Sequence, residues 1–259
     1  MNSDKVEFQN EDGHTLSGRL ETPDGNAPAA YAIFAHCFTC SKDYKAITFV
    51  SRTLAERGIA VLRFDFTGLG ESEGDFGGTS FASNVDDLLA AARYLESEHS
   101  APNILVGHSL GGAAVIQAAA EVPAAVAVAT IGAPADPAHV AHLLTGAIDD
   151  IRRDGEAEVM LAGRKFRIGE KFLDDLEETR QNDRIGSLDR ALIIFHSPVD
   201  MIVGIENAAR IYATARHPKS FISLDQADHL LTDPSDASYV GEVLAAWARK
   251  YLPECRTRD

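Results

Sequence analysis

The stretch from Asn103 to Val115 reads NILVGHSLGGAAV, in which an apolar run ends at Gly107 and an alanine-rich segment follows Gly112. A histidine and a serine lie between the two. Serine is a poor strand residue, and glycine costs conformational entropy in strands and helices alike. A turn or a helix cap would account for Ser109. The alternative is a nucleophile held on a strained bend between a buried strand and a helix.

Strands and helices alternate along the chain. Continuous apolar runs typical of strands buried on both faces recur at residues 29–37, 59–66, 103–108, 125–134 and 191–198. Segments with helical spacing separate them, a hairpin is expected at the N-terminus, and a strand at 221–225 precedes a last helix at 237–252. This alternation predicts an α/β fold with a doubly wound, mostly parallel sheet and helices on both faces. We expect a single domain over residues 1–259.

One interval, residues 137–190, is far longer than a connection between two strands needs. Residues 139–153 are amphipathic, residues 157–168 suggest a hairpin that turns at Ala162-Gly163, and residues 170–181 have helical spacing. We therefore expect a small lid inserted into the domain at about 137–190. A merely decorative insertion is the alternative.

Charge and composition limit the partners. The formal net charge of −15 argues against nucleic acid and anionic membrane surfaces as partners. The three cysteines are too few for a secreted disulfide framework, and the N-terminal residues lack the apolar run of a signal peptide. We expect a cytoplasmic protein with no membrane span. The sequence leaves open whether the chain forms a homo-oligomer.

The segment Gly107-His108-Ser109-Leu110-Gly111 matches the pattern G-x-S-x-G between a strand and a helix. A serine hydroxyl needs a base to remove its proton, and the base needs an acid to orient it. Asp200 and His229 each come just after a predicted strand, in the order Ser, Asp, His that such a sheet requires. A turn cap at Asp200 and a surface histidine at His229 are the alternatives. Jointly, the three positions favour a catalytic triad.

With these residues in view, the chain resembles the α/β-hydrolase superfamily, of the esterase and lipase type, over essentially its whole length. It is similar to small cinnamoyl-esterase-like acyl hydrolases. It is also similar to the hydrolase part of fusions that carry an osmotically-inducible-protein-C-type peroxide-reducing domain. The matching pieces are FAHCFTCSKD (34–43), LRFDFTGLGES (62–72), VGHSLGG (106–112), HSPVDMIV (196–203) and ADHLL (227–231).

The resemblance implies an oxyanion hole built from the backbone N–H groups of Leu110 and Phe38. Relatives usually have glycine where this chain has Cys37, so the position of the Phe38 donor is the less secure of the two. His36 and His108 are expected to hydrogen-bond loop backbone rather than to act as bases.

The function that the resemblance implies is a serine hydrolase that cleaves carboxylic esters of short acyl or compact aryl acids through an acyl-enzyme intermediate. Its partner would be a small-molecule ester substrate, and the chemistry requires no cofactor and no metal. Thioesterase, acyltransferase and peptidase activities would use the same triad. A non-catalytic or redox module of the same fold is the alternative from another class.

Three further motifs have competing explanations. The sequence CFTC at 37–40 suits a redox pair or part of a zinc site, but two packed thiols are the favoured interpretation. The glycine-rich stretch 68–78 does not fit a nucleotide-binding loop, and its acidic residues would repel phosphate. His139 and His142 are three residues apart on a predicted lid helix, where an exposed pair is favoured over a metal site.

Overall fold

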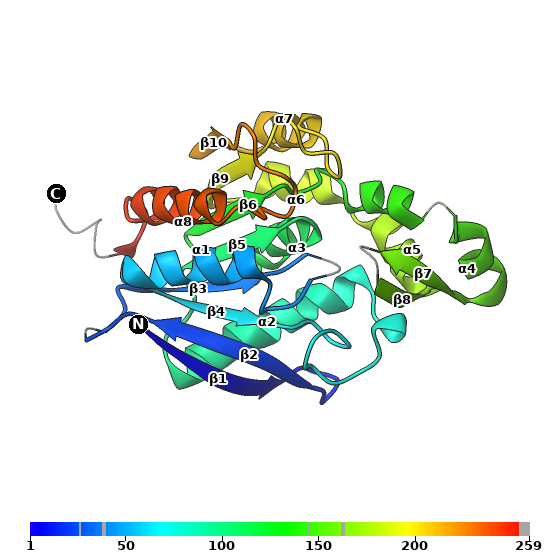
Figure 1. The fold of residues 1–259 in the computed structure, drawn as a ribbon, viewed down its shortest axis with the longest axis horizontal. Coiled ribbons are helices and arrows are strands. Elements are labelled where there is room, and N and C mark those ends of the chain that lie inside the picture. Colours follow the sequence, from blue (N-terminus) through cyan, green and yellow to red (C-terminus); the bar gives the residue numbers. More distant parts are fainter. Residues whose placement is uncertain (26, 38–39, 145, 162–163, 254–259) are drawn as a thin grey trace.

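The computed structural model describes residues 1–259 except 26, 38–39, 145, 162–163 and 254–259 (Figure 1). Within the described residues, eight strands form one sheet in the order β1-β2-β4-β3-β5-β6-β9-β10. The strands are β1 (Asn2–Gln9), β2 (Thr15–Thr22), β3 (Ala30–Ala35), β4 (Ile59–Phe64), β5 (Ile104–His108), β6 (Ala127–Ile131), β9 (Ala191–His196) and β10 (Lys219–Ser223). From β4 to β10 in that order the strands are parallel, whereas β2 is antiparallel to both β1 and β4. The predicted α/β fold is confirmed.

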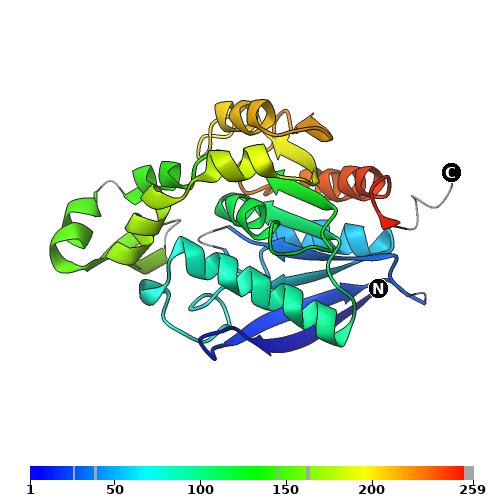
Figure 2. The ribbon, with the colours of Figure 1, turned by 180° about the vertical axis from the view of Figure 1, so that it is seen from behind.

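Helices cover both faces of the sheet. On one face lie α1 (Lys45–Glu56) and α8 (Pro234–Ala248), whose apolar side chains share one buried cluster with the sheet (Figure 1). The opposite face, turned forward in Figure 2, carries α2 (Phe81–Glu98), α3 (Leu110–Ala118), α6 (Gln181–Ser187) and α7 (Glu206–Thr214). All residues of β5 and β6 are buried, which explains why these strands appear in the sequence as unbroken apolar runs.

Specific residues fix where these helices begin and end. Gly58 follows α1 with φ +88°, a left-handed conformation that glycine adopts without steric cost, and the chain turns there into β4. Ser80 begins α2 by accepting a hydrogen bond from the amide of Ser83 at 3.2 Å. In the described part of the chain, no helix is long and apolar enough to cross a membrane.

The inserted segment (residues 137–190) lies between β6 and β9. It contains η2 (Pro137–Leu144), α4 (Ile148–Asp154), β7 (Glu156–Leu161), β8 (Arg164–Gly169), α5 (Glu170–Glu178) and α6. The strands β7 and β8 pair antiparallel, as the predicted hairpin requires, whereas its turn at Ala162-Gly163 lies outside the described residues. In Figure 1 α4, β7, β8 and α5 extend from one end of the molecule. The predicted helix over residues 170–181 corresponds to α5, whereas α6 was not predicted.

Most described apolar side chains of the inserted segment are buried. Phe166 and Phe172 pack near Phe76 of η1 (Phe76–Gly78), with ring centroids 5.9 and 6.3 Å from it. Leu144, Ile168 and Leu173 are buried in the same hydrophobic cluster as α2 and α3. Met160, by contrast, is 59% exposed. The segment thus packs on the face of the domain that carries α3. The expected exposure of His139 and His142 concerns side chains outside those described.

Candidate active site

Ser109 lies between the last residue of β5 and the first residue of α3, with φ 55° and ψ −125°. The surrounding glycines explain the G-x-S-x-G pattern. A Cβ atom added at Gly107 would lie 2.2 Å from the backbone oxygen of Gly111, and one added at Gly111 would lie 2.5 Å from that of Ala35. No larger residue fits either position without movement of the backbone. The N–H of Ser109 donates to the oxygen of Ile131 at 2.8 Å, which fixes the bend to the neighbouring strand.

Three side chains from three strand ends form one hydrogen-bonded row. The Ser109 hydroxyl donates to Nε2 of His229 at 3.0 Å, and Nδ1–H of His229 donates to Oδ2 of Asp200 at 2.7 Å. Ser109 follows β5, Asp200 follows β9, and His229 follows β10. Because these strands are parallel, their carboxyl ends meet at one edge of the sheet. Sequence positions 91 and 29 residues apart are therefore brought within hydrogen-bonding distance.

Asp200 is an oriented and ionised carboxylate. Its Oδ1 accepts the N–H groups of Ile202 at 2.8 Å and Val203 at 2.9 Å, which leaves Oδ2 for His229. Burial alone would raise the pKa of Asp200. The hydrogen bond and charge of His229, together with the two amides, outweigh burial and hold that pKa below its ordinary value. The carboxylate can thus fix the His229 ring and stabilise a positive charge on it.

Gly132, just after β6, is a residue of this site that the sequence analysis missed. Its φ is +54°, and a Cβ atom there would lie 3.3 Å from both Oδ2 of Asp200 and Nδ1 of His229. Its N–H donates to the oxygen of Phe195 at 2.9 Å. The backbone therefore passes directly beside the Asp200–His229 hydrogen bond. A glycine at the end of a predicted strand was the only signal in the sequence.

Two further histidines bond to backbone, as predicted. Nε2–H of His108 donates to the backbone oxygen of His229 at 2.7 Å. Nδ1–H of His36 donates to the oxygen of Cys37 at 2.7 Å, and its Nε2 accepts the amide of Phe66 at 3.4 Å. Burial and the neighbouring His229 lower the pKa of His108 to about 3, so that this ring is neutral near pH 7. Neither ring is positioned to take a proton from Ser109.

His196 at the end of β9 is a third buried histidine, and the sequence analysis gave it no role. Its Nε2–H donates to the backbone oxygen of Val203 at 2.7 Å, and Nε2 lies 3.7 Å from Oδ2 of Asp200. Burial lowers the pKa of His196 and keeps the ring neutral. The ring thereby holds the loop that presents Asp200.

The structure describes one of the two predicted oxyanion donors. Leu110 is the first residue of α3, so its N–H lies at a helix N-terminus, where positive potential is concentrated. Phe38 lies outside the described residues. Leu110 and Gly111 also line a small cavity of about 10 Å³, together with His36, Phe66, Leu69, Phe76, Asn84 and Ala114. The space beside Leu110 is therefore narrow and mostly apolar.

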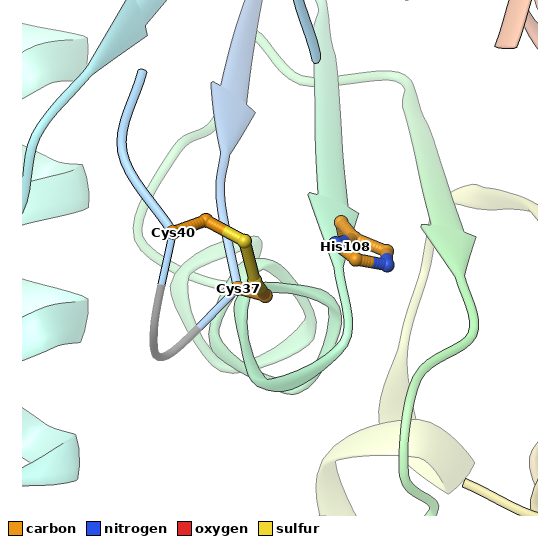
Figure 3. Close-up of side chains that lie close together, drawn as sticks. All are labelled: Cys37, Cys40 and His108. Atoms are coloured by element: carbon orange, nitrogen blue, oxygen red, sulfur yellow. A yellow bond between two sulfur atoms is a disulfide. The ribbon is translucent and has the colours of Figure 1, made fainter. Parts of the chain in front are cut away.

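The expectation of two packed thiols in the CFTC stretch is wrong. Cys37 and Cys40 are joined by a disulfide, with their Cα atoms 5.3 Å apart. The N–H of Cys40 also donates to the oxygen of Cys37 at 3.1 Å. Figure 3 shows His108 beside this disulfide. The two sulfurs and a ring nitrogen of His108 lie within 4.8 Å of one another. Among the described residues, these three side chains have the spacing needed to hold a metal ion.

A buried ion pair supports the same loop. Lys42 is 1% exposed, and its ammonium donates to Asp65 at 2.7 Å and to Glu71 at 3.0 Å. The N–H of Lys42 donates to the other oxygen of Asp65 at 2.6 Å. Arg63 in turn donates to the backbone oxygen of Lys42. The segment after Cys40 is thus fixed to the end of β4 by charges that hydropathy alone would place at the surface.

Comparisons with known proteins point to one family. The sequence profile described as "Alpha/beta hydrolase family" matches residues 32–257. The esterase domain of a Rhodothermus marinus protein is 53% identical, with a TM-score of 0.81 over 97% of this chain and 100% of that one. Est1E from Butyrivibrio proteoclasticus, solved with ferulic acid bound, is 20% identical, with a TM-score of 0.78 over 95% and 99%. At that identity the similarity to Est1E concerns the fold alone.

A curated relative also matches most of this chain, and its name states no activity. The uncharacterized protein YfhR of Salmonella typhi is 24% identical over 237 residues, which cover 88% of this chain and 75% of that protein. The similarity thus extends over nearly all of the chain, as the family profile does.

Proposed function

The chain belongs to the alpha/beta hydrolase family, and on that premise we propose that it is a serine hydrolase of carboxylic esters. The fold of this family supports hydrolase activity. The observation that carries the finer proposal is the hydrogen-bonded row of Ser109, His229 and Asp200. The high similarity to an esterase domain supports esters as the substrate class.

In the first half-reaction His229 takes the proton of Ser109 through Nε2 while Oγ attacks the ester carbonyl carbon. Asp200 keeps the ring in the tautomer with hydrogen on Nδ1 and stabilises the imidazolium that forms. Negative charge develops on the carbonyl oxygen, and the N–H groups of Leu110 and Phe38 are the proposed donors to it. His229 then gives its proton to the departing alcohol, which leaves an acyl group on Ser109.

In the second half-reaction a water molecule takes the place of the alcohol. His229 removes a proton from the water, the resulting oxygen attacks the acyl carbon, and the same donors hold the second oxyanion. Collapse of this intermediate returns the proton from His229 to Ser109 Oγ and releases the acid. Protons and charges balance over the cycle without a cofactor.

The proposed substrates are esters of short acyl or compact aryl acids. The cavity beside Leu110 measures about 10 Å³, close to what one water molecule needs, so an acyl or aryl group fits there only if the lining side chains move. Phe76 lines this cavity and also packs near Phe166 and Phe172 of the inserted segment. We infer that residues 137–190 act as a lid that limits the space for the acyl group through Phe76.

A fluorophosphonate label tests the nucleophile. Wild-type protein should incorporate one label per chain, on Ser109, and Ser109→Ala should incorporate none. Ser51→Ala is the matched control, because Ser51 is a buried serine of α1 whose hydroxyl has no hydrogen-bond partner among the described residues. Persistent labelling of Ser109→Ala would refute Ser109 as the nucleophile, and a wild-type protein that takes up no label would favour a non-catalytic or redox module.

Thioesterases, acyltransferases and peptidases would use the same residues. A matched series of ester, thioester and amide with one acyl group separates them. Our proposal requires the highest kcat/KM for the ester in water, with no increase in product when an alcohol or amine acceptor is added.

A further inference from the structure

Three groups with affinity for soft metals meet beside the proposed nucleophile. Cys37 and Cys40 follow β3, and His108 is the last residue of β5, the strand that pairs with β3. All three side chains are buried. Figure 3 shows the imidazole of His108 next to the two sulfurs, and the ligand atoms lie within 4.8 Å of one another.

We propose that, when the Cys37–Cys40 disulfide is reduced, these three residues form a binding site for a thiophilic divalent cation such as Zn²⁺. Two cysteines separated by two residues, together with a histidine, are a common ligand set for zinc. Zinc bonds to sulfur at about 2.3 Å and to imidazole nitrogen at about 2.0–2.1 Å. Ligand atoms of a tetrahedral complex with such bonds lie about 3.3–3.8 Å apart. The two sulfurs must therefore separate when the disulfide is reduced, and the ring nitrogen must approach them by up to about 1 Å. Three protein ligands leave one tetrahedral position for water.

The hydrogen bond of His108 prepares its ring for this role. A carbonyl oxygen only accepts, so the contact between Nε2 and the oxygen of His229 at 2.7 Å places the ring hydrogen on Nε2. In a neutral imidazole the lone pair is then on Nδ1. Histidine ligands in metal sites characteristically donate their other N–H to a backbone carbonyl or carboxylate, which fixes tautomer and orientation.

The charge of the complex suits a buried position. Two thiolates and a neutral imidazole around one divalent ion have a net charge of zero, so burial does not leave an uncompensated charge. The backbone hydrogen bond from the N–H of Cys40 to the oxygen of Cys37 keeps these two residues close to each other. The disulfide and the metal complex are mutually exclusive states of one pair of cysteines.

The conversion balances with a dithiol as reductant. The dithiol gives two hydrogens and becomes a cyclic disulfide, the Cys37–Cys40 bond breaks, and each sulfur becomes a thiol. The divalent ion then displaces one proton from each thiol and forms two metal–sulfur bonds. Two protons leave for each ion that binds.

Cobalt titration of the full chain tests the proposal, since Co²⁺ takes the place of Zn²⁺ and gives thiolate-to-metal absorption. The experiment uses the Cys255→Ser background, so that Cys37 and Cys40 are the only thiols. After dithiol reduction and removal of the reductant, two thiols should react and one Co²⁺ should bind per chain, displaced by Zn²⁺. The same protein before reduction is the matched control and should bind none.

Variants locate the site. Cys37→Ser, Cys40→Ser and His108→Asn should each weaken Co²⁺ binding by about 100-fold or more, because loss of even an outer partner costs roughly 10- to 100-fold. Ser109→Ala should bind Co²⁺ as the parent does, which separates this inference from the proposed hydrolase mechanism. Sulfurs that resist reduction in the folded protein, reduced protein that binds no Co²⁺, or binding that survives in all three ligand variants would overturn it. Circular dichroism establishes that each variant is folded.

Discussion

The ring of His108 donates a 2.7 Å hydrogen bond to the backbone oxygen of His229. His108, the residue before Ser109, thus holds the loop that carries His229, the hydrogen-bond partner of Ser109. Ser109 and His229 are coupled twice, once between side chains and once through the backbone of His229. His108 lies next to Ser109 but is excluded as its base. The Nε2–H of His108 is bonded to a carbonyl oxygen, and the pKa of the ring is lowered to about 3.

Removal of any member of the proposed triad should abolish most ester turnover. Ser109→Ala and His229→Ala should lower kcat by about 10⁴-fold or more, and Asp200→Asn somewhat less, because the three groups act as a unit. Steady-state kinetics with a nitrophenyl ester measure the effect. Asp225→Asn is the matched control for the acid, since Asp225 accepts only from Ser223 among the bonds described. Activity above a tenth of wild type in Ser109→Ala contradicts the covalent mechanism.

Gly132→Ala should impair catalysis more than folding. The new Cβ atom would lie 3.3 Å from Asp200 Oδ2 and His229 Nδ1, so their hydrogen bond must shift. We expect kcat/KM to fall by about tenfold or more, since small displacements of catalytic groups cost about that much or more. Gly58→Ala is the control, because Gly58 also has positive φ but has open space around it. Both variants should lose about 1–2 kcal/mol of stability. Equal kcat/KM in the two would show that contact at Gly132 is unimportant.

Lys42→Met should be strongly destabilising, although lysine is usually a surface residue. It removes the ammonium that pairs with the fully buried Asp65, which retains only backbone donors. Breaking one side of a buried ion pair typically costs about 3–5 kcal/mol. Urea unfolding at pH 7 measures the loss. Glu71→Gln, at a side chain that is 59% exposed, should cost much less than Lys42→Met, because solvent screens its charge. A loss below about 1 kcal/mol for Lys42→Met would mean that the pair is not needed.

Stability should fall with acid in part because of His196. Burial lowers the pKa of His196 in the folded protein. Below about pH 6.5 the unfolded chain binds a proton that the folded chain does not, so unfolding becomes easier as the pH falls. The contribution is at most about 1.4 kcal/mol per pH unit and ends once the pH reaches the lowered pKa.

His196→Asn should therefore flatten the dependence of unfolding free energy on pH between about 6.5 and 5. Denaturant titrations at several pH values measure the slope, and His99→Asn supplies the same substitution at an exposed histidine. An unchanged slope in His196→Asn would show that this ring does not link folding to protons.

Acyl specificity should favour short chains. Each methylene that enters an apolar pocket contributes about 0.8 kcal/mol, or about fourfold in kcat/KM, until the pocket is full. Nitrophenyl esters of increasing chain length should therefore show an early maximum. Leu69→Ala enlarges the cavity and should move the maximum to longer acyl groups, whereas Leu88→Ala removes the same atoms at a core position outside that cavity. A maximum at long fatty chains in wild type would contradict the proposed substrate class.

The fold was predictable because its signals are local. Each buried parallel strand is a continuous apolar run, and residues of β5 and β6 are buried without exception. The positions of Asp200 and His229 after strands followed from the same pattern. In contrast, α6 is polar in sequence, and its first residue, Gln181, is buried because its amide donates to the oxygen of Ala113 at 3.1 Å. The hydropathy of the sequence does not predict that hydrogen bond.

Other parts of the candidate site depend on contacts between distant segments. Lys42 and Asp65 are both buried and form an ion pair, and Lys42 also pairs with Glu71. The contact of Gly132 with Asp200 and His229 requires three strand ends to be in place. Likewise, the proximity of His108 to the two cysteines follows from the pairing of β3 with β5. Residue type and spacing predict such relationships poorly, because the partners are far apart in the chain.

Ser109 has φ 55° and ψ −125°, which glycine adopts more readily than any residue with a Cβ atom. A conformation of this kind costs on the order of 1–3 kcal/mol. The proposed chemistry needs a hydroxyl at a position where conformational stability alone would favour glycine. Stability and turnover therefore compete at this residue, and selection for heat resistance without selection for activity would favour loss of the serine.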